Sequence, residues 1–404
     1  MRKILLGSTA VVGLALTGAA AQAQTAPTVR IGGFMEVAGA YAAGDDADKA
    51  VPGVRRARQK FDFRNESEVH VFVTGKAANG LAYGATIELQ MDNLGGSGAG
   101  TGVDTDEGYL WVSSPVFGNV RLGDEDSAAS LMQVRVPTIT GMGPDGNWDE
   151  LTTNRSSTSN PWSYTLSGIN DGNDSTKLIY LSPQFYGFDF GASYAPNSGE
   201  GERVWQGASS TVSQRDYTTL TNEVSLAARY RGSFAGVGVA AGFGMQMAGP
   251  PKATQAPSNL QDIRVYTVGL NLSYVGFTVG GEYTWGQYSG TSQRTALPRG
   301  ASDSHHYVVG VTYTLAALSL GAYVGQAEQD KLTVRSGVFG HDRKQTVWGI
   351  GTSYNLAPGL DLIASYNNGR DKYGPDMSTS TSPASPGPTG RNLQVIYAGA
   401  RLAF

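Results

Sequence analysis

The chain has 404 residues, with 55 glycines, 20 tyrosines and no cysteine, and its formal net charge is −4. Charged residues make up only 16% of it, against about 25% in soluble domains. The lack of cysteine excludes a disulfide scaffold and a thiolate metal site. The acidic balance argues against nucleic acid as a partner, because nucleic acid needs a basic surface.

The first 23 residues have the layout of a secretory signal peptide. Arg2 and Lys3 form a charged start, residues 4–21 are apolar, and Ala21-Gln22-Ala23 fits a small-residue cleavage site. A membrane-anchoring helix is the alternative, and the small residues disfavour it. We therefore expect a signal peptide over residues 1–23 and one mature domain over residues 24–404. The mature part has no run of 18 apolar residues, which excludes a helical membrane protein.

From residue 29 to the last residue, apolar and polar side chains alternate with a period of two. Val29 and Ile31 share one face of the first segment, while Arg30 lies on the other. Sixteen such segments follow one another, each close to the roughly 9–11 residues that a tilted membrane strand needs.

Short and long connections alternate between these segments. Eight connections are long and polar, including residues 44–60 and 286–304, and seven are short: residues 79–80, 113–119, 183–187, 231–236, 275–276, 314–317 and 355–359. Short turns at one end and long loops at the other are typical of an outer-membrane barrel, and a soluble sandwich has no reason to segregate them.

At this point the sequence resembles the Gram-negative general porin family. The resemblance rests on the alternating segments, on Leu178–Pro183 followed by Phe185 and Gly187-Phe188, on residues 117–123, and on the terminal Phe404. It implies an all-β fold, a sixteen-stranded antiparallel transmembrane barrel with an inward-folded third loop. It also implies a homotrimer in the outer membrane, with Phe404 as the signal read by the assembly machinery. Residues 141–148 depart from the Pro-Glu-Phe-Gly-Gly signature of enteric members, so the sequence is closer to the non-enteric type.

The third long connection, about residues 125–174, shows no alternation and would be anomalous in a compact domain. The resemblance implies that it narrows the pore. Its acids would then form an acidic constriction, and the facing barrel wall should present bases of inward parity, which together create a transverse field. The acids are Glu125, Asp126, Asp145, Asp149 and Glu150, and the bases are Arg30, Arg64 and Arg121. Alternatively, inward polar residues merely keep the lumen wet, and Glu66 and Glu68 simply pair with Arg64.

No cofactor motif is present, and the spacing of the four histidines fits no metal-binding motif. Two acid-rich turns contain residues that could bind Ca²⁺, namely Asp104, Asp106, Asp171 and Asp174. Neither turn fits the twelve-residue calcium loop, and solvated turn chemistry is the ordinary interpretation. We therefore predict no metal site. Trp148 and Trp162, in the third loop, are expected to pack that loop against the wall, and an apolar or sugar-stacking surface is the alternative.

These observations predict a general diffusion porin, not an enzyme, that passes ions and small hydrophilic solutes with a weak preference for cations. Its other expected partners are outer-membrane lipid and lipopolysaccharide. In the first long loop, Arg55, Arg56 and Arg58 are interpreted as contacts to lipopolysaccharide or to other loops, or simply as solvated charge. A substrate-selective channel for sugars or phosphate is one alternative. It would need a row of inward aromatics or a cluster of inward bases. A lipid hydrolase barrel is another, although it would use fewer strands and need a Ser/His pair on its lipid face.

Overall fold

The computed structural model describes residues 25–44, 59–91, 103–143, 146, 148, 168–169, 174–198, 219–251, 260–288, 296–297, 299–329, 333–335, 338–339, 342–372 and 390–404. Within these ranges, no helix has the length and apolar character to cross a membrane. The expected signal peptide and the bases at positions 55, 56 and 58 lie outside the described residues.

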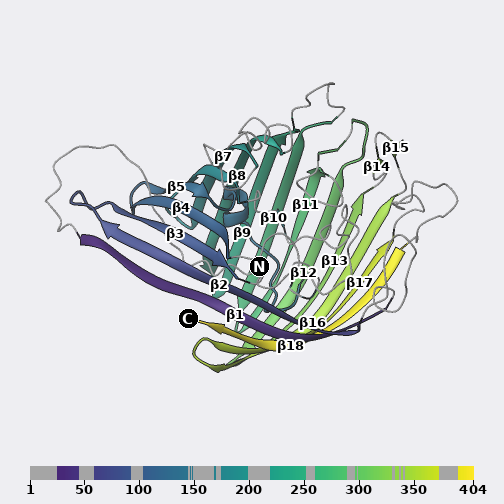
Figure 1. The fold of residues 1–404 in the computed structure, drawn as a ribbon. Helices are drawn as coiled ribbons and strands as arrows, with labels where there is room; N and C mark the ends of the chain where they lie inside the picture. Colours follow the sequence, from purple (N-terminus) through teal and green to yellow (C-terminus); the bar gives the residue numbers. More distant parts are fainter. Residues whose placement is uncertain are drawn as a thin grey trace.

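Sixteen antiparallel strands form one closed barrel, as the alternation predicted (Figure 1). The strands of the barrel are β1 (Thr25–Gly44), β2 (Phe61–Lys76), β3 (Ala82–Gln90), β4 (Asp104–Ser114), β5 (Gly118–Asp124), β6 (Thr176–Leu181), β7 (Phe188–Asn197), β8 (Thr221–Phe234), β9 (Val237–Gly249), β10 (Ile263–Tyr274), β11 (Phe277–Gln287), β12 (Ser304–Leu315), β13 (Leu318–Gln329), β16 (Arg343–Ala357), β17 (Leu360–Lys372) and β18 (Gly390–Ala403). A separate hairpin, β14 (Thr333–Arg335) and β15 (Val338–Phe339), lies in the connection between β13 and β16.

The two ends of the described chain close the barrel. β18 pairs antiparallel with β1 over the register from Phe34 with Ala403 to Gly44 with Leu393, and the two strands run side by side in Figure 1. Gly33 and Phe404 exchange both backbone hydrogen bonds, with N–O distances of 3.0 and 3.1 Å. No strand of the barrel therefore has a free edge that could pair with another chain.

All seven predicted short connections are turns at one end of the barrel. The turn from β10 to β11 has positive φ angles at both central residues, 45° at Val275 and 80° at Gly276. Such a backbone matches the right-handed twist of a hairpin. Aromatic rings meet beside these turns, as in the pairs Phe277–Tyr313, at 4.2 Å between ring centroids, and Phe188–Tyr230, at 4.9 Å.

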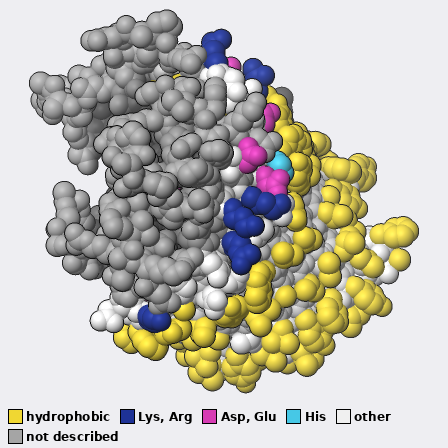
Figure 2. Space-filling model, turned by 90° about the vertical axis from the view of Figure 1, so that its right-hand side faces the viewer, with side chains coloured by type: hydrophobic (Ala, Val, Ile, Leu, Met, Phe, Trp, Pro, Cys, Tyr) yellow, Lys and Arg dark blue, Asp and Glu magenta, His cyan; other side chains and the backbone are white. Residues whose placement is uncertain are grey.

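The outer face of the barrel is apolar, and the inner face carries the polar side chains. Val29, Ile31 and Leu110 are all more than 60% exposed, and hydrophobic side chains cover much of the described outer surface in Figure 2. Glu36, Ser225 and Thr284 are buried and face inward. So wide an exposed apolar surface is stable in lipid and would aggregate in water.

Candidate functional site

The third loop enters the barrel directly after β5. Its first element is α2 (Ala128–Met132), capped by Ser127, whose hydroxyl accepts from the Ser130 amide at 3.3 Å. Two hydroxyls of the barrel wall accept hydrogen bonds from the first two amides of the helix. Ser193 of β7 accepts from the Ala128 amide at 3.0 Å, and Ser225 of β8 accepts from the Ala129 amide at 2.8 Å. The wall of the barrel thus fixes where this helix begins.

Beyond α2, the loop continues along the inner wall, which confirms its inward path as far as residue 143. The Val136 amide donates to Glu282 of β11 at 3.1 Å. Asn271 of β10 donates to the Arg135 carbonyl at 2.9 Å, and Ser365 of β17 donates to the Gly141 carbonyl at 2.8 Å. The described start of the loop is therefore anchored to strands that span more than half of the barrel.

Glycines of the inner wall make room for the loop. A Cβ atom at Gly269 would lie 1.9 Å from the Val134 carbonyl oxygen, and one at Gly310 would lie 2.6 Å from the Pro137 carbonyl oxygen. A Cβ at Gly351 would meet the Ile139 side chain at 3.2 Å. Because the loop backbone packs this closely on the sheet, larger side chains at these positions would push it into the lumen.

Trp148 confirms the prediction that it packs the loop against the wall. It is 1% exposed and belongs to an apolar cluster with inward residues of β1 and β18, including Ala38 and Tyr397. Its indole nitrogen donates to the Gly143 carbonyl at 2.6 Å.

Glu36, in the middle of β1, is the hub of a buried charge network. The Tyr397 hydroxyl donates to it at 2.5 Å, and Arg401 and Arg64 lie 3.5 and 3.9 Å from its carboxylate oxygens. Arg64 also pairs with Glu66 at 3.0 Å. Sequence reasoning missed Glu36 and Arg401 because neither is near a motif. Their shared inward parity on adjoining strands β1 and β18 was the signal available.

Arg121 points inward, as predicted, but it does not face the loop acids across a gap. Its guanidinium pairs with Glu125, four residues later in the chain, and donates to Asn119 at 3.2 Å and to Tyr109 at 3.3 Å. Lys177 of β6 donates to the Glu125 carbonyl. For this pair the predicted transverse arrangement is wrong. The loop begins directly at the end of β5, so its first acid lies beside the base that this strand carries.

Arg30 also has inward parity, but it lies near the short-turn end of β1 and is exposed. Its guanidinium covers the ring of Phe72 at 4.1 Å, and Arg401 covers the ring of Phe34 at 3.7 Å. Arg30 therefore lines the mouth of the barrel and not its middle. Of the predicted bases, only Arg64 and Arg121 are buried on the inner wall.

Several predicted site residues lie outside the described part of the chain: Asp145, Asp149, Glu150, Trp162, Asp171 and the side chain of Asp104. Asp126 is 4% exposed. It meets Glu107 and Asp174 in a group whose carboxylate oxygens lie within 4.8 Å of one another. Of the candidate Ca²⁺ ligands, Asp174 therefore belongs to this group, together with Glu107 and Asp126. Oxygen-rich groups of this kind suit hard cations, and acidic groups are also common in proteins without one.

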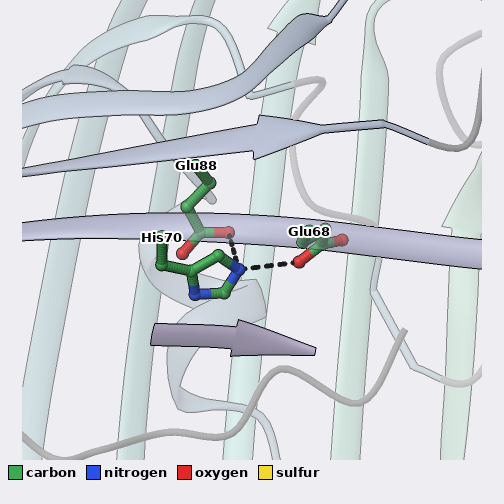
Figure 3. Close-up of side chains that lie close together, drawn as sticks. All are labelled: Glu68, His70 and Glu88. Atoms are coloured by element: carbon green, nitrogen blue, oxygen red, sulfur yellow. Dashed lines mark hydrogen bonds and ion pairs between the residues drawn. The ribbon is translucent and has the colours of Figure 1, made fainter. Parts of the chain in front are cut away.

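A second group combines a histidine with two carboxylates, Glu68, His70 and Glu88 (Figure 3). The His70 Nε2 atom lies 2.9 Å from Glu68 and 3.7 Å from Glu88. Glu68 therefore contacts His70, and not Arg64 as the sequence suggested for it. Sequence reasoning missed this group, because it judged histidines by their spacing from one another and not by the register of neighbouring strands.

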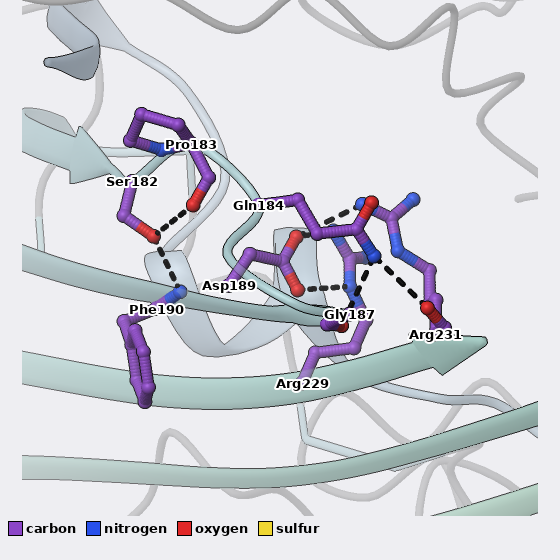
Figure 4. Close-up of polar contacts among 8 residues, drawn as sticks. All are labelled: Ser182, Pro183, Gln184, Gly187, Asp189, Phe190, Arg229 and Arg231. Carbon is purple, nitrogen blue, oxygen red and sulfur yellow. Dashed lines mark hydrogen bonds and ion pairs between the residues drawn. The ribbon is translucent and has the colours of Figure 1, made fainter. Parts of the chain in front are cut away.

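A third polar cluster lies at the short-turn end (Figure 4). Asp189 is 5% exposed and accepts from Arg229 at 2.6 and 3.2 Å and from Arg231 at 3.0 Å. Ser182, before the turn, accepts from the Phe190 amide at 2.8 Å. These contacts hold the β6–β7 turn against β8, which gives the Ser-Pro segment a structural role.

Comparisons with known proteins agree with this architecture. A family model described as Gram-negative porin matches residues 7–374. An anion-selective porin from Comamonas acidovorans has 15% identity and a TM-score of 0.62, covering 94% of this chain and 100% of its own. OmpT of Vibrio cholerae, in a trimer form, has 16% identity and a TM-score of 0.56 over 94% and 100%. A triple mutant of a Rhodopseudomonas blastica porin has 16% identity and a TM-score of 0.55 over 93% and 100%. No curated protein matches the chain. At these identities the structural likeness concerns the fold alone.

Proposed function

Because the chain belongs to the Gram-negative porin family, we propose that it is a general diffusion porin. It would let ions and small hydrophilic solutes cross the outer membrane down their gradients, with no covalent step. The observation that carries this proposal is the closed barrel of sixteen strands with a charged inner wall and a third loop that begins inside it. A barrel of this strand number encloses an aqueous channel.

We further propose a weak preference for cations. Carboxylates outnumber cations on the buried and half-buried inner wall of β18 and β1–β6 and at the start of the third loop. The acids there include Glu36, Glu66, Glu68, Glu88, Glu107, Glu125 and Asp126, and the cations include Arg64, Lys76, Arg121, Arg135, Lys177 and Arg401. Fixed negative charge along a narrow water column raises the local concentration of cations.

In this proposal the wall contributes as much to selectivity as the loop does. Asp145, Asp149 and Glu150 would add to the acidic field from the loop. The anion selectivity in the name of the Comamonas porin belongs to that protein, and at 15% identity it does not carry over to this chain. The sign of selectivity is therefore a property of this chain's own lumen.

Planar-bilayer recording under a KCl gradient tests the preference for cations. We expect stepwise insertions and a reversal potential of the cation sign, which moves toward zero in a variant with Asp145→Asn, Asp149→Asn and Glu150→Gln. The same neutralisation at the exposed Asp262, which lies just before β10 at the long-loop end, is the matched control and should change the potential little. A reversal potential of the anion sign would contradict the acidic-lumen proposal.

The inner aromatics favour a general pore over a sugar-selective one. Sugar binding would need open aromatic faces along the lumen, but Arg401 covers one face of Phe34 and Arg30 covers one face of Phe72. Trp111 lies against Gly84, where a Cβ would be only 2.6 Å from the indole. These rings are used for packing and cation–π contacts.

We also propose that the mature chain assembles as a homotrimer, surrounded by outer-membrane lipid and lipopolysaccharide, after cleavage following residue 23. A trimer form is named for OmpT of Vibrio cholerae. N-terminal sequencing of protein extracted from outer membranes should begin at Gln24. Light scattering in detergent should give three times the chain mass, and a monomer that conducts would contradict the trimer.

A further inference from the structure

We propose that Glu68, His70 and Glu88 form a binding site for one transition-metal dication on the lumen wall, with Zn²⁺ as the best match. The inference rests on three side chains that the fold brings to one point of the inner face. It goes beyond the proposed pore function, because a site of this kind can bind its cation whether or not the pore conducts.

Strand register creates the site. Glu68 and His70 are two residues apart on β2 and so share its inward face. His70 is the register partner of Glu88 on β3. Because both strands are held in a closed barrel, the positions of the three side chains are fixed by backbone pairing and not by a loop.

The distances fit a tetrahedral ion. Zn²⁺ binds imidazole nitrogen and carboxylate oxygen at about 2.0–2.2 Å, so two of its tetrahedral ligand atoms lie about 3.3 Å apart. The His70 Nε2 atom is 2.9 Å from Glu68 Oε2 and 3.7 Å from Glu88 Oε2, on either side of that value. Figure 3 shows both carboxylates directed at the same ring nitrogen. Small side-chain rotations would therefore suffice to bind the ion.

The environment suits a cation that arrives through the pore. The side chains of His70, Glu68 and Glu88 are 19%, 6% and 12% exposed, so the group is mostly shielded yet open to the lumen. Water from the lumen can supply the fourth ligand. Phe34 and Phe72 contact the imidazole edge-on, with ring centroids 6.5 and 5.9 Å away, and hold the ring in place.

The donor set also selects the class of cation. Nitrogen from imidazole with carboxylate oxygens suits Zn²⁺ and its neighbours, whereas Ca²⁺ and Mg²⁺ prefer oxygen ligands alone. Binding requires Nε2 without a proton, so uptake of Zn²⁺ releases that proton or moves it to Nδ1. The site should therefore prefer Zn²⁺ to Ca²⁺.

Isothermal titration of the purified, detergent-solubilised full-length mature protein with ZnCl₂ tests the site directly. We expect one Zn²⁺ per chain. The variants His70→Gln and Glu88→Gln should each weaken binding by at least about tenfold, since even outer-shell partners of metal ligands are worth 10–100-fold. Heat-modifiable mobility on a gel shows that each variant is folded, and Glu68→Gln replaces any variant that is not.

The matched control is His305→Gln, at a second histidine–glutamate pair. His305 lies 3.8 Å from Glu328, whose carboxylate is shared with Lys344, so its loss should leave Zn²⁺ binding unchanged. Equal binding by wild type and His70→Gln, no binding up to millimolar Zn²⁺, or equally tight binding of CaCl₂ would each overturn the proposal. Because the titration needs no current, it can fail while the pore proposal stands, and the reverse is also true.

Discussion

Substituting Gly269 by alanine should move the third loop into the lumen. The added Cβ would lie 1.9 Å from the Val134 carbonyl oxygen, whereas ordinary contact begins at 3.4 Å. The clash is with backbone on both sides, so a rotamer change cannot relieve it. The loop must shift by about 1.5 Å, and overpacking of this kind costs about 1–3 kcal/mol.

The same shift should lengthen the nearby anchor between Asn271 and the Arg135 carbonyl. This hydrogen bond is 2.9 Å long, and a displacement of that size would take it beyond the range of a hydrogen bond. Narrowing of the lumen and loss of this anchor should both lower the single-channel conductance of Gly269→Ala. The unfolding free energy should fall by about 1–3 kcal/mol.

Single-channel recording and denaturant unfolding in detergent measure the two effects. Gly108→Ala is the matched control, because a Cβ there would meet its nearest neighbour, Thr105, at an ordinary 3.7 Å. If Gly269→Ala had the conductance and stability of the control, the loop would not rest on this wall as described, and the reasoning would be refuted.

Three further variants test the Arg121–Glu125 ion pair, the charge network around Glu36 and the terminal Phe404. Arg121→Met should lower the unfolding free energy by about 3–5 kcal/mol, because it leaves the buried Glu125 carboxylate without its ion pair; a loss under about 1 kcal/mol would contradict a buried pair. Glu36→Gln removes the carboxylate that Arg64 and Arg401 share, so it should move the reversal potential toward zero. An unchanged reversal potential would show that this network lies away from the ion path. Phe404→Ala keeps the backbone hydrogen bonds to Gly33 but loses the exposed ring. It should reduce the amount of heat-modifiable protein in the outer membrane without changing the stability of what folds, and a normal yield would contradict a role in assembly.

The barrel itself was predictable because alternation with period two is a local signal. Every short turn predicted from the sequence is a turn in the structure, including the Asn79-Gly80 turn between β2 and β3. The residues of the short turns mark where the strands end at one end of the barrel. Hydrophobic alternation then sets which face points outward, and together they fix the strand count.

The lumen was harder to predict, because its contacts join residues that are far apart in the chain. Glu36 meets Tyr397 across the seam where β1 and β18 close the barrel. No local pattern in the sequence indicates that contact. The role of Gly269 and Gly310 could not be predicted, since it depends on contacts with a loop that has no periodicity of its own.

The proximity of the proposed metal-binding residues could have been predicted from the sequence. His70 and Glu88 lie nine residues on either side of Asn79, at the centre of the β2–β3 turn, so counting outward from that turn pairs them. By contrast, the pairing of Arg121 with Glu125 could not follow from parity alone. Parity gives the face of a strand but not the point at which the next loop begins.

Liposome swelling tests most directly whether this chain forms a general pore. Liposomes containing the purified protein are diluted into iso-osmotic solutions of uncharged sugars and amino acids of graded size, with liposomes lacking protein as the control. We expect swelling rates that fall smoothly with solute size and depend little on solute chemistry. A rate that saturates for one solute class and excludes others of equal size, or no swelling with heat-modifiable protein, would contradict a general diffusion pore.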